Sequence, residues 1–139
     1  MRDGLVSNKP ALLRSKPRAA QQLVFDGMEF GGNRYPTDID GFMEFSDKVY
    51  AFFEVKYQDA PMSRGQEIAL ARLCDIVQRS GRESILVLCS HSVHDSSSDV
   101  ALASCIVIQY RYKFKWHIMT ERRTVKDVID CYLKNTGIV

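Results

Sequence analysis

The chain has 139 residues, of which 45% are hydrophobic and 26% charged, and its formal net charge is +2. This composition is typical of a soluble globular protein, and the length predicts one domain over residues 1–139 that can bury a core. The apolar runs are too short to cross a bilayer, and the basic N-terminus lacks the hydrophobic region of a secretory signal, so we expect neither a membrane protein nor an exported one.

The four cysteines are widely spaced and lie among apolar residues: Cys74, Cys89, Cys105 and Cys131. They form neither a CxxC pair nor a compact framework. We therefore expect reduced, buried thiols in a cytoplasmic protein, and no structural zinc.

Positive charge is concentrated toward the two ends of the chain. Residues 1–20 contain five Lys or Arg against one Asp, and residues 111–126 contain six against one Glu. Residues 37–75 reverse the balance, with eight acids and four bases. An acidic centre between basic flanks can attract a polyanion while it keeps carboxylates at its middle, although basic ends are more often only solvated.

The first half of the chain predicts a helix followed by a hairpin. Residues 1–9 have the composition of a loose tail, and a helix is expected to begin after Pro17 and to end near Phe25. Residues 37–45 and 49–57 then predict two strands joined by a tight turn.

The second half predicts a helix, a buried strand, two further strands and a last helix. Ser63 and Gln66 have the spacing of a capping box that opens a helix ending near Gly81. Residues 84–90 form a continuous apolar run, which is typical of a strand buried on both faces. A loop, a short helix at 99–104, strands within 105–110 and 113–119, and a helix capped by Thr124 and Asp127 follow. The order predicts an α/β fold around one mixed sheet.

Four charged side chains interrupt the two hairpin strands: Asp38, Asp40, Glu54 and Lys56. Charges inside strands cost stability unless they are solvated, paired or bound. A two-residue turn would place Asp40 opposite Phe53 and put the two carboxylates on opposite faces. A three-residue turn over 46–48 would place Asp40 opposite Glu54 and Asp38 opposite Lys56, within about 5–7 Å of one another. We adopt the three-residue turn as our hypothesis.

Two carboxylates and a lysine on one face predict a site for phosphodiester hydrolysis. Close carboxylates repel each other unless a cation lies between them, and oxygen ligands of this kind suit Mg²⁺ or Mn²⁺. A neighbouring lysine can hold an attacking water and neutralise the charge that grows on a phosphate. In the plainer alternative, Glu54 and Lys56 lie on an exposed face and pair with Lys48 or Asp38.

The segments YPTDIDGF at 35–42 and FFEVK at 52–56 resemble the core motif of the PD-(D/E)XK nuclease superfamily. The resemblance implies a restriction-endonuclease-like or Holliday-junction-resolvase-like core over residues 17–90: a central mixed sheet with a catalytic hairpin, flanked by helices on both faces. It also implies that Asp40, Glu54 and the Val55 carbonyl bind Mg²⁺, with Mn²⁺ as a substitute, and that Lys56 positions the attacking water. Gln66 occupies the place of a glutamine that many members carry, and it fits the capping box equally well.

Further residues are weaker candidates. Asp38 can replace or assist Asp40, and Glu29 is the nearest candidate for a metal ligand from the first helix. Four basic residues are candidate DNA contacts, although each taken singly is more often solvated: Arg34, Arg64, Lys113 and Lys115. His91 and His94 have a metal-like spacing without an evident third ligand, so we expect them outside the site. Four aromatics at 110, 112, 114 and 116 alternate as on a strand face and are more often core than a platform for bases.

The leading hypothesis is therefore a small Mg²⁺-dependent DNA endonuclease in the cytoplasm of a bacterial or phage-infected cell. Branched or structured DNA as the substrate, and a homodimer as the acting form, fit a chain of this size. The first alternative is a non-catalytic DNA-binding or assembly module that retains the nuclease fold. The second is an unrelated α/β protein whose strand charges are solvated.

Overall fold

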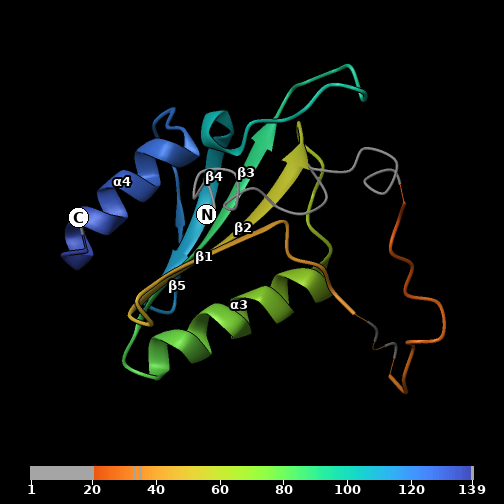
Figure 1. Ribbon diagram of the computed structural model, residues 1–139, viewed down its shortest axis with the longest axis horizontal. Coiled ribbons are helices and arrows are strands. Elements are labelled where there is room, and N and C mark those ends of the chain that lie inside the picture. Colours follow the sequence, from red (N-terminus) through yellow and green to blue (C-terminus); the bar gives the residue numbers. More distant parts are fainter. Residues whose placement is uncertain (1–20, 33, 35, 139) are drawn as a thin grey trace, which may run out of the picture. The chain divides into compact units, whose positions relative to one another are not determined.

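The structure, a computed structural model, describes residues 21–32, 34 and 36–138 (Figure 1). The chain divides into two compact parts between Pro36 and Thr37, and each is described by itself. In the first part, the described residues include a turn at Asp26–Gly27 and a bridge between Phe30 and Arg34. The single domain over 1–139 stays a prediction.

The prediction of a helix that ends near Phe25 is wrong for the residues that the structure describes. Residues 21–25 have no helical backbone, and the side chains of Leu23 and Val24 are largely exposed. A short helix is marginal unless it buries an apolar face, and these side chains bury little. Residues 1–20, which hold the predicted tail and the start of that helix, lie outside the described residues.

The second part is an α/β structure built on one open, mixed, five-stranded sheet in the order β1-β2-β3-β4-β5. The strands are β1 (Gly41–Phe45), β2 (Val49–Tyr57), β3 (Glu83–His91), β4 (Ile106–Tyr112) and β5 (Lys115–Ile118). β2 and β3 are parallel, and the other neighbours are antiparallel. A parallel pair needs a crossover connection, which here is the helix α3 (Arg64–Arg79).

Helices cover both faces of this sheet, because alternate side chains of β2 and β3 enter two separate cores (Figure 1). On one face, Phe52 and Leu86 pack with Leu70 of α3. On the other face, Phe53 and Val87 belong to the core that includes α4 (Val125–Thr136). β3 is buried from Ser84 to Cys89, as its apolar run predicts. Neither α3 nor α4, in the described part of the chain, has the length and apolar character needed to cross a membrane.

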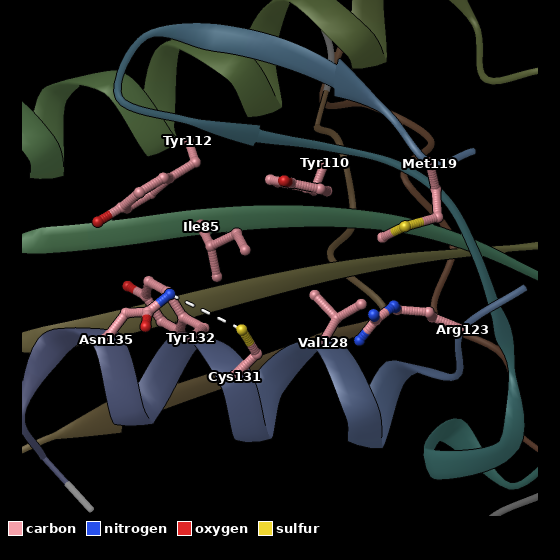
Figure 2. Close-up of a pocket in the computed structure, with 9 residues that line it drawn as sticks. All are labelled: Ile85, Tyr110, Tyr112, Met119, Arg123, Val128, Cys131, Tyr132 and Asn135. Carbon is pink, nitrogen blue, oxygen red and sulfur yellow. Dashed lines mark hydrogen bonds between the residues drawn. The ribbon is translucent and has the colours of Figure 1, made fainter. Parts of the chain in front are cut away.

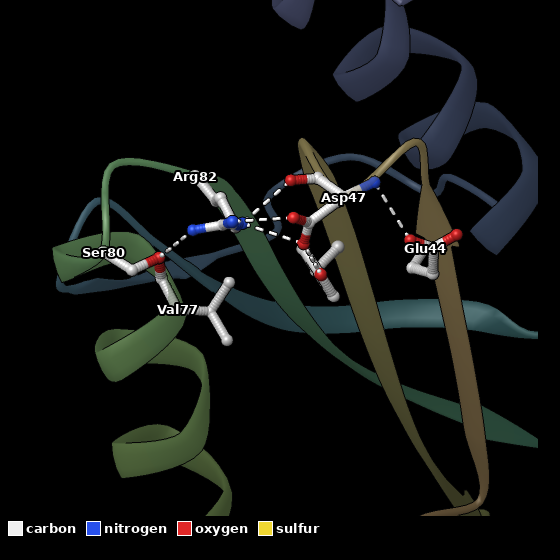
Figure 3. A network of polar contacts seen from close by, with 6 residues as sticks. Glu44, Asp47, Val77, Ser80 and Arg82 are labelled. Atoms are coloured by element: carbon white, nitrogen blue, oxygen red, sulfur yellow. Dashed lines mark hydrogen bonds and ion pairs between the residues drawn. The ribbon is translucent and has the colours of Figure 1, made fainter.

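The hairpin has the predicted three-residue turn. Phe45 pairs with Val49 and Gly41 with Phe53, so the same register carried one residue further brings Asp40 opposite Glu54. The turn is held from outside the hairpin by Arg82, whose Nε and Nη2 donate to the Asp47 carboxylate at 2.9 and 2.7 Å (Figure 3).

The same network satisfies an unusual backbone in that turn. Ser46 and Asp47 have left-handed φ angles of 54° and 58°, which non-glycine residues rarely adopt. The Arg82 Nε also donates to the Asp47 carbonyl at 2.8 Å, and the Asp47 N–H donates to Glu44 Oε2 at 3.0 Å. The Tyr50 hydroxyl also donates to Asp47. These contacts fix the turn length on which the hairpin register depends.

Several smaller predictions need correction. The short helix expected at 99–104 is a single 3₁₀ turn, Leu102–Ser104. Lys113 and Phe114 form the β4–β5 turn with positive φ angles, so the four aromatics do not share one strand face. Trp116 packs on the α3 side, whereas Tyr110 and Tyr112 pack on the α4 side.

All four cysteines are free thiols, and three of them are buried. The prediction of burial is wrong for Cys131, which is exposed on α4. That helix turns Val128, Ile129 and Tyr132 toward the core, and position 131 falls outside this apolar stripe.

Candidate active site

Glu54 is a buried carboxylate near the end of β2, on the face that α3 covers. It is only 2% exposed. A charge removed from water must be paired and hydrogen-bonded to be tolerated. Here the Lys56 Nζ lies 2.9 Å from Glu54 Oε2, and the Gln66 Nε2 donates to the same oxygen at 2.8 Å. One oxygen of Glu54 is thus held by two donors from two different elements.

The side chain of Gln66 contacts both Lys56 and Glu54. Its Oε1 accepts a hydrogen bond from Lys56 Nζ at 3.3 Å while its Nε2 donates to Glu54. Its backbone N–H donates to Ser63 Oγ at 3.2 Å, which caps α3. Among the described hydrogen bonds, none returns from the Gln66 side chain to Ser63. The two roles left open by the sequence are therefore divided: the backbone of Gln66 serves the cap, and its side chain serves the hairpin.

The second oxygen of Glu54, Oε1, is buried and has no hydrogen-bond partner among the described residues. A buried acceptor without a partner costs about 1–3 kcal/mol. Burial raises the pKa of the Glu54 carboxyl; the hydrogen bond from Lys56 lowers it, and the charge of Asp40 raises it again. Glu54 therefore has an unused oxygen next to a second negative charge, an arrangement that a bound cation would relieve.

Asp40 lies immediately before β1 and is exposed. Its Oδ2 accepts a hydrogen bond from the Val55 N–H at 2.7 Å. The carboxylate takes the place of a strand carbonyl there, so β1 begins at Gly41 and not at the predicted residue 37. Glycine suits position 41, since a Cβ atom there would lie 3.1 Å from the Phe53 ring, a tight contact. Asp40 is thus fixed beside the residue that follows Glu54.

Asp40 and Glu54 form a small set of oxygen donors. In residues 21–32, 34 and 36–138, no three His, Cys, Asp or Glu side chains form a group able to hold a metal ion. Asp40 and Glu54 supply two carboxylates, and further ligands would have to be backbone carbonyls or water. Mg²⁺ is commonly bound by one or two carboxylates and keeps several waters, so the chemistry of the donors fits this ion.

The other acids and Arg34 are not brought to the site by any described contact. Asp38 is exposed ahead of β1, and no ion pair joins it to Lys56 among the described residues. Glu29 and Arg34 belong to the part of the chain before Thr37, so their roles stay predictions.

The remaining basic candidates lie in different places. Arg64 is exposed in the first turn of α3, the turn that contains Gln66. Lys113 pairs with Glu83 at 3.0 Å in the β4–β5 turn, and Lys115 is opposite Tyr112. Tyr112 is level with Ile85 of β3, whereas Lys56 is level with Ser90, about 17 Å further along the strand. Lys113 and Lys115 are thus at the other end of the sheet.

His91 and His94 make local contacts around Tyr57. The Tyr57 hydroxyl and His94 Nδ1 lie 2.7 Å apart, and His91 Nδ1 accepts from the Val93 N–H at 3.1 Å. The Tyr57 ring lies 5.4 Å from the His91 ring. Tyr57 follows Lys56 in β2, so alternation puts it on the opposite face of the sheet. Sequence reasoning missed this Tyr–His cluster, because the loop that returns His94 to β2 has no local signal.

The described residues line hollows on both faces of the sheet. One, of about 380 Å³, opens beside Lys56. Another, of about 260 Å³, lies between α4 and the strands β3 and β4, with Tyr110, Tyr112 and Tyr132 around it and Arg123 at one end (Figure 2). None of the described residues that line this second hollow carries a carboxylate, so they do not supply the acids that metal-dependent hydrolysis requires.

Comparison of the chain with models of protein families, with curated proteins and with solved structures found no match in any of the three. The resemblance to the PD-(D/E)XK nucleases therefore depends on the motif residues of the sequence alone.

Proposed function

We propose that this protein is a Mg²⁺-dependent deoxyribonuclease of the PD-(D/E)XK type with a restriction-endonuclease-like core. The observation that carries the proposal is the state of Glu54: one buried oxygen is held by Lys56 and Gln66, and the other has no partner among the described residues. A purely structural ion pair would account for the first oxygen and would leave the second unexplained.

In this proposal, Asp40, Glu54 and the Val55 carbonyl hold the metal ion, with Mn²⁺ able to replace Mg²⁺. The bound ion neutralises charge on the phosphate and makes a water molecule more acidic. Lys56 is suited to meet the substrate because its side chain is 28% exposed while its ammonium is fixed 2.9 Å from Glu54. It would hold the attacking water and offset the charge that grows on the phosphate. Gln66 would keep Lys56 and Glu54 in register.

The proposed substrate is DNA. More specifically, we propose that a homodimer cuts branched or structured DNA. Among the described residues, one five-stranded sheet and its helices offer no separate module for reading a long base sequence. This favours recognition of DNA structure or ends, through phosphate contacts that are independent of sequence.

The deciding experiment is nicking of supercoiled plasmid with Mg²⁺, with Mn²⁺, and with EDTA. The parent protein is expected to nick with either metal and to stop with EDTA. Glu54→Gln and Lys56→Met should each lower the rate about 100-fold or more, the scale of losing one group that stabilises transition-state charge. Lys126→Met is the matched control, because its ammonium makes an exposed pair with Asp130 on α4. A Lys56→Met protein that nicks at the parent rate would refute the mechanism, and DNA binding without any cleavage would favour a non-catalytic module.

A second measurement tests the metal site without cleavage. Ions that bind only the folded protein raise its melting temperature. Mg²⁺ and Mn²⁺ should therefore raise the melting temperature of the parent and of Lys126→Met, and they should leave that of Glu54→Gln unchanged. An equal shift in all three proteins would place the bound ion elsewhere.

A further inference from the structure

The hollow of about 380 Å³ beside Lys56, here called the Lys56 cleft, has walls from four elements. Lys56 of β2 is one of its lining residues. The loop after β2 contributes Gln58 to Met62, α3 contributes Glu67, and β3 and β4 contribute Leu88 to Ser90 and Ile108 to Gln109. Since Lys56 also contacts Glu54 and Gln66, the cleft begins where the proposed catalytic group ends. Under the proposed function, a group that enters the cleft would lie close to the phosphate that is cut.

The charge of the lining argues against a phosphate inside the cleft. Its charged side chains are Lys56, Asp59 and Glu67, and the ammonium of Lys56 is already paired with Glu54. A surface that follows the nucleic-acid backbone is expected to be rich in Lys and Arg. This lining is negative on balance, so it suits a neutral part of a nucleotide.

The remaining lining has the chemistry that recognises a base. Gln58, Ser90 and Gln109 offer amide and hydroxyl groups, and none of the three side chains makes a hydrogen bond among the described residues. Such groups donate to and accept from the edge of a base. Met62 and Ile108 supply apolar walls. The volume falls in the range of small-ligand sites. None of the described residues that line the cleft is aromatic, so recognition would come from the base edge and not from stacking.

We infer that the Lys56 cleft receives the base of an unpaired nucleotide next to the cleaved phosphate. The inference rests on the proposed nuclease function and specifies which DNA structure the enzyme would prefer. A base inside a duplex is stacked and paired, so it cannot reach a pocket unless it leaves the helix. An unpaired nucleotide at a bulge, a flap or a branch is already free to enter. The structural preference of the enzyme then follows from the cleft and needs no sequence reading.

The test compares labelled oligonucleotides that differ at one position. The first is a full duplex, the second has a one-nucleotide bulge, and the third has the same bulge with an abasic tetrahydrofuran residue. With Mg²⁺, the parent should cut beside the bulge about tenfold or more faster than in the duplex, and the abasic bulge should lose this advantage. Gln109→Leu and Ser90→Ala should bring the ratio of the two bulge rates toward one. Lys126→Met, on α4, should keep the parent ratio, and melting curves check that the variants fold.

Binding is measured in parallel with Glu54→Gln, which is not expected to cut. Its Kd should be lower for the bulge than for the abasic bulge. If the parent cuts all three substrates at equal rates, the cleft inference is wrong while the nuclease proposal stands. If nothing is cut but the bulge is bound more tightly than its abasic form, the nuclease proposal fails and the cleft remains a base-binding site. Neither cleavage nor a difference in Kd would overturn both.

Discussion

Replacing Lys56 with methionine isolates the contribution of one charge, because methionine keeps most of the apolar stem and removes the ammonium 2.9 Å from Glu54 Oε2. The variant would leave a carboxylate that is 2% exposed with only its hydrogen bond from Gln66. The protein can escape the unpaired charge by binding a proton. Holding a carboxyl of ordinary pKa 4.5 neutral at pH 7 costs about 1.4 kcal/mol per pH unit, which sets a ceiling of about 3.4 kcal/mol.

The expected loss is smaller than this ceiling. The Lys56 side chain is 28% exposed, so water already screens part of its attraction to Glu54. The hydrogen bond from Gln66 also remains. We expect the free energy of unfolding at pH 7 to fall by about 2 kcal/mol, well above the effect of breaking an exposed pair.

The dependence on pH distinguishes this cause from lost packing. Burial raises the pKa of Glu54 in the folded state, so the folded protein binds the proton more tightly than the unfolded chain does. Stability from this group is therefore lost as pH rises above 4.5 and through the folded pKa. Removing Lys56 raises that pKa further and widens the window. The gap between parent and variant should be largest at pH 7–8 and should nearly close by about pH 4.5.

Urea denaturation followed by fluorescence of Trp116, the single tryptophan, measures this gap. Lys126→Met is again the control and should change stability by less than about 0.5 kcal/mol, since its pair with Asp130 is exposed. The double variant Lys56→Met with Glu54→Gln should recover most of the loss, because no buried charge remains. A loss that is the same at pH 5 and pH 8, or a double variant as unstable as Lys56→Met, would refute the reasoning.

Three further predictions follow from contacts of single residues. Gln66→Ala should slow plasmid nicking strongly and lower the stability measured by thermal melting by about 1–2 kcal/mol, because it removes the contacts with Glu54 and Lys56. Ser63→Ala should lower stability by about 1 kcal/mol through the lost cap and leave nicking unchanged. Equal losses of activity in the two variants would contradict the division of roles. The hydrogen bond from Arg82 lowers the pKa of Asp47 to about 2, so hydrogen-exchange protection of β1 should hold above pH 4 and decline toward pH 2, and Asp47→Ala should lose it at every pH. Iodoacetamide should label Cys131 alone in the native protein, because the other three cysteines are buried and burial raises the pKa of the Cys89 thiol to about 12. Mass spectrometry that shows several labelled thiols would contradict this.

Local signals were enough to predict the centre of the fold. The apolar run of β3 and the cap of α3 act within a few residues, and both elements lie where the sequence places them. The hairpin register was predictable only once a three-residue turn was assumed, because the Arg82 contacts that fix the turn length come from a residue 35 positions away along the chain. Alternation along β2 and a turn of three residues together allow a single pairing of Asp40 with respect to Glu54.

What the sequence left open depends on contacts between distant segments. The capping pattern of Gln66 is the same whether its side chain returns to Ser63 or reaches Glu54, and only the packing of α3 on β2 decides. The position of Lys113 follows from the β3–β4 register, which shifts at an irregularity between Leu88 and Cys89. The alternating aromatics contain no sign of the turn at Lys113–Phe114, because neither residue favours positive φ.

The parallel pairing of β2 and β3 has a consequence for the electrostatics of the site. β2 ends at the end of the sheet where Glu54 and Lys56 lie, and α3 begins at that same end, with Gln66 in its first turn. The start of an α-helix presents unpaired N–H groups and carries about half a positive elementary charge. This partial charge lies on the side of the carboxylates and of any phosphate brought to them. The crossover helix between the two parallel strands thus gives the site a positive electrostatic potential that does not depend on pH.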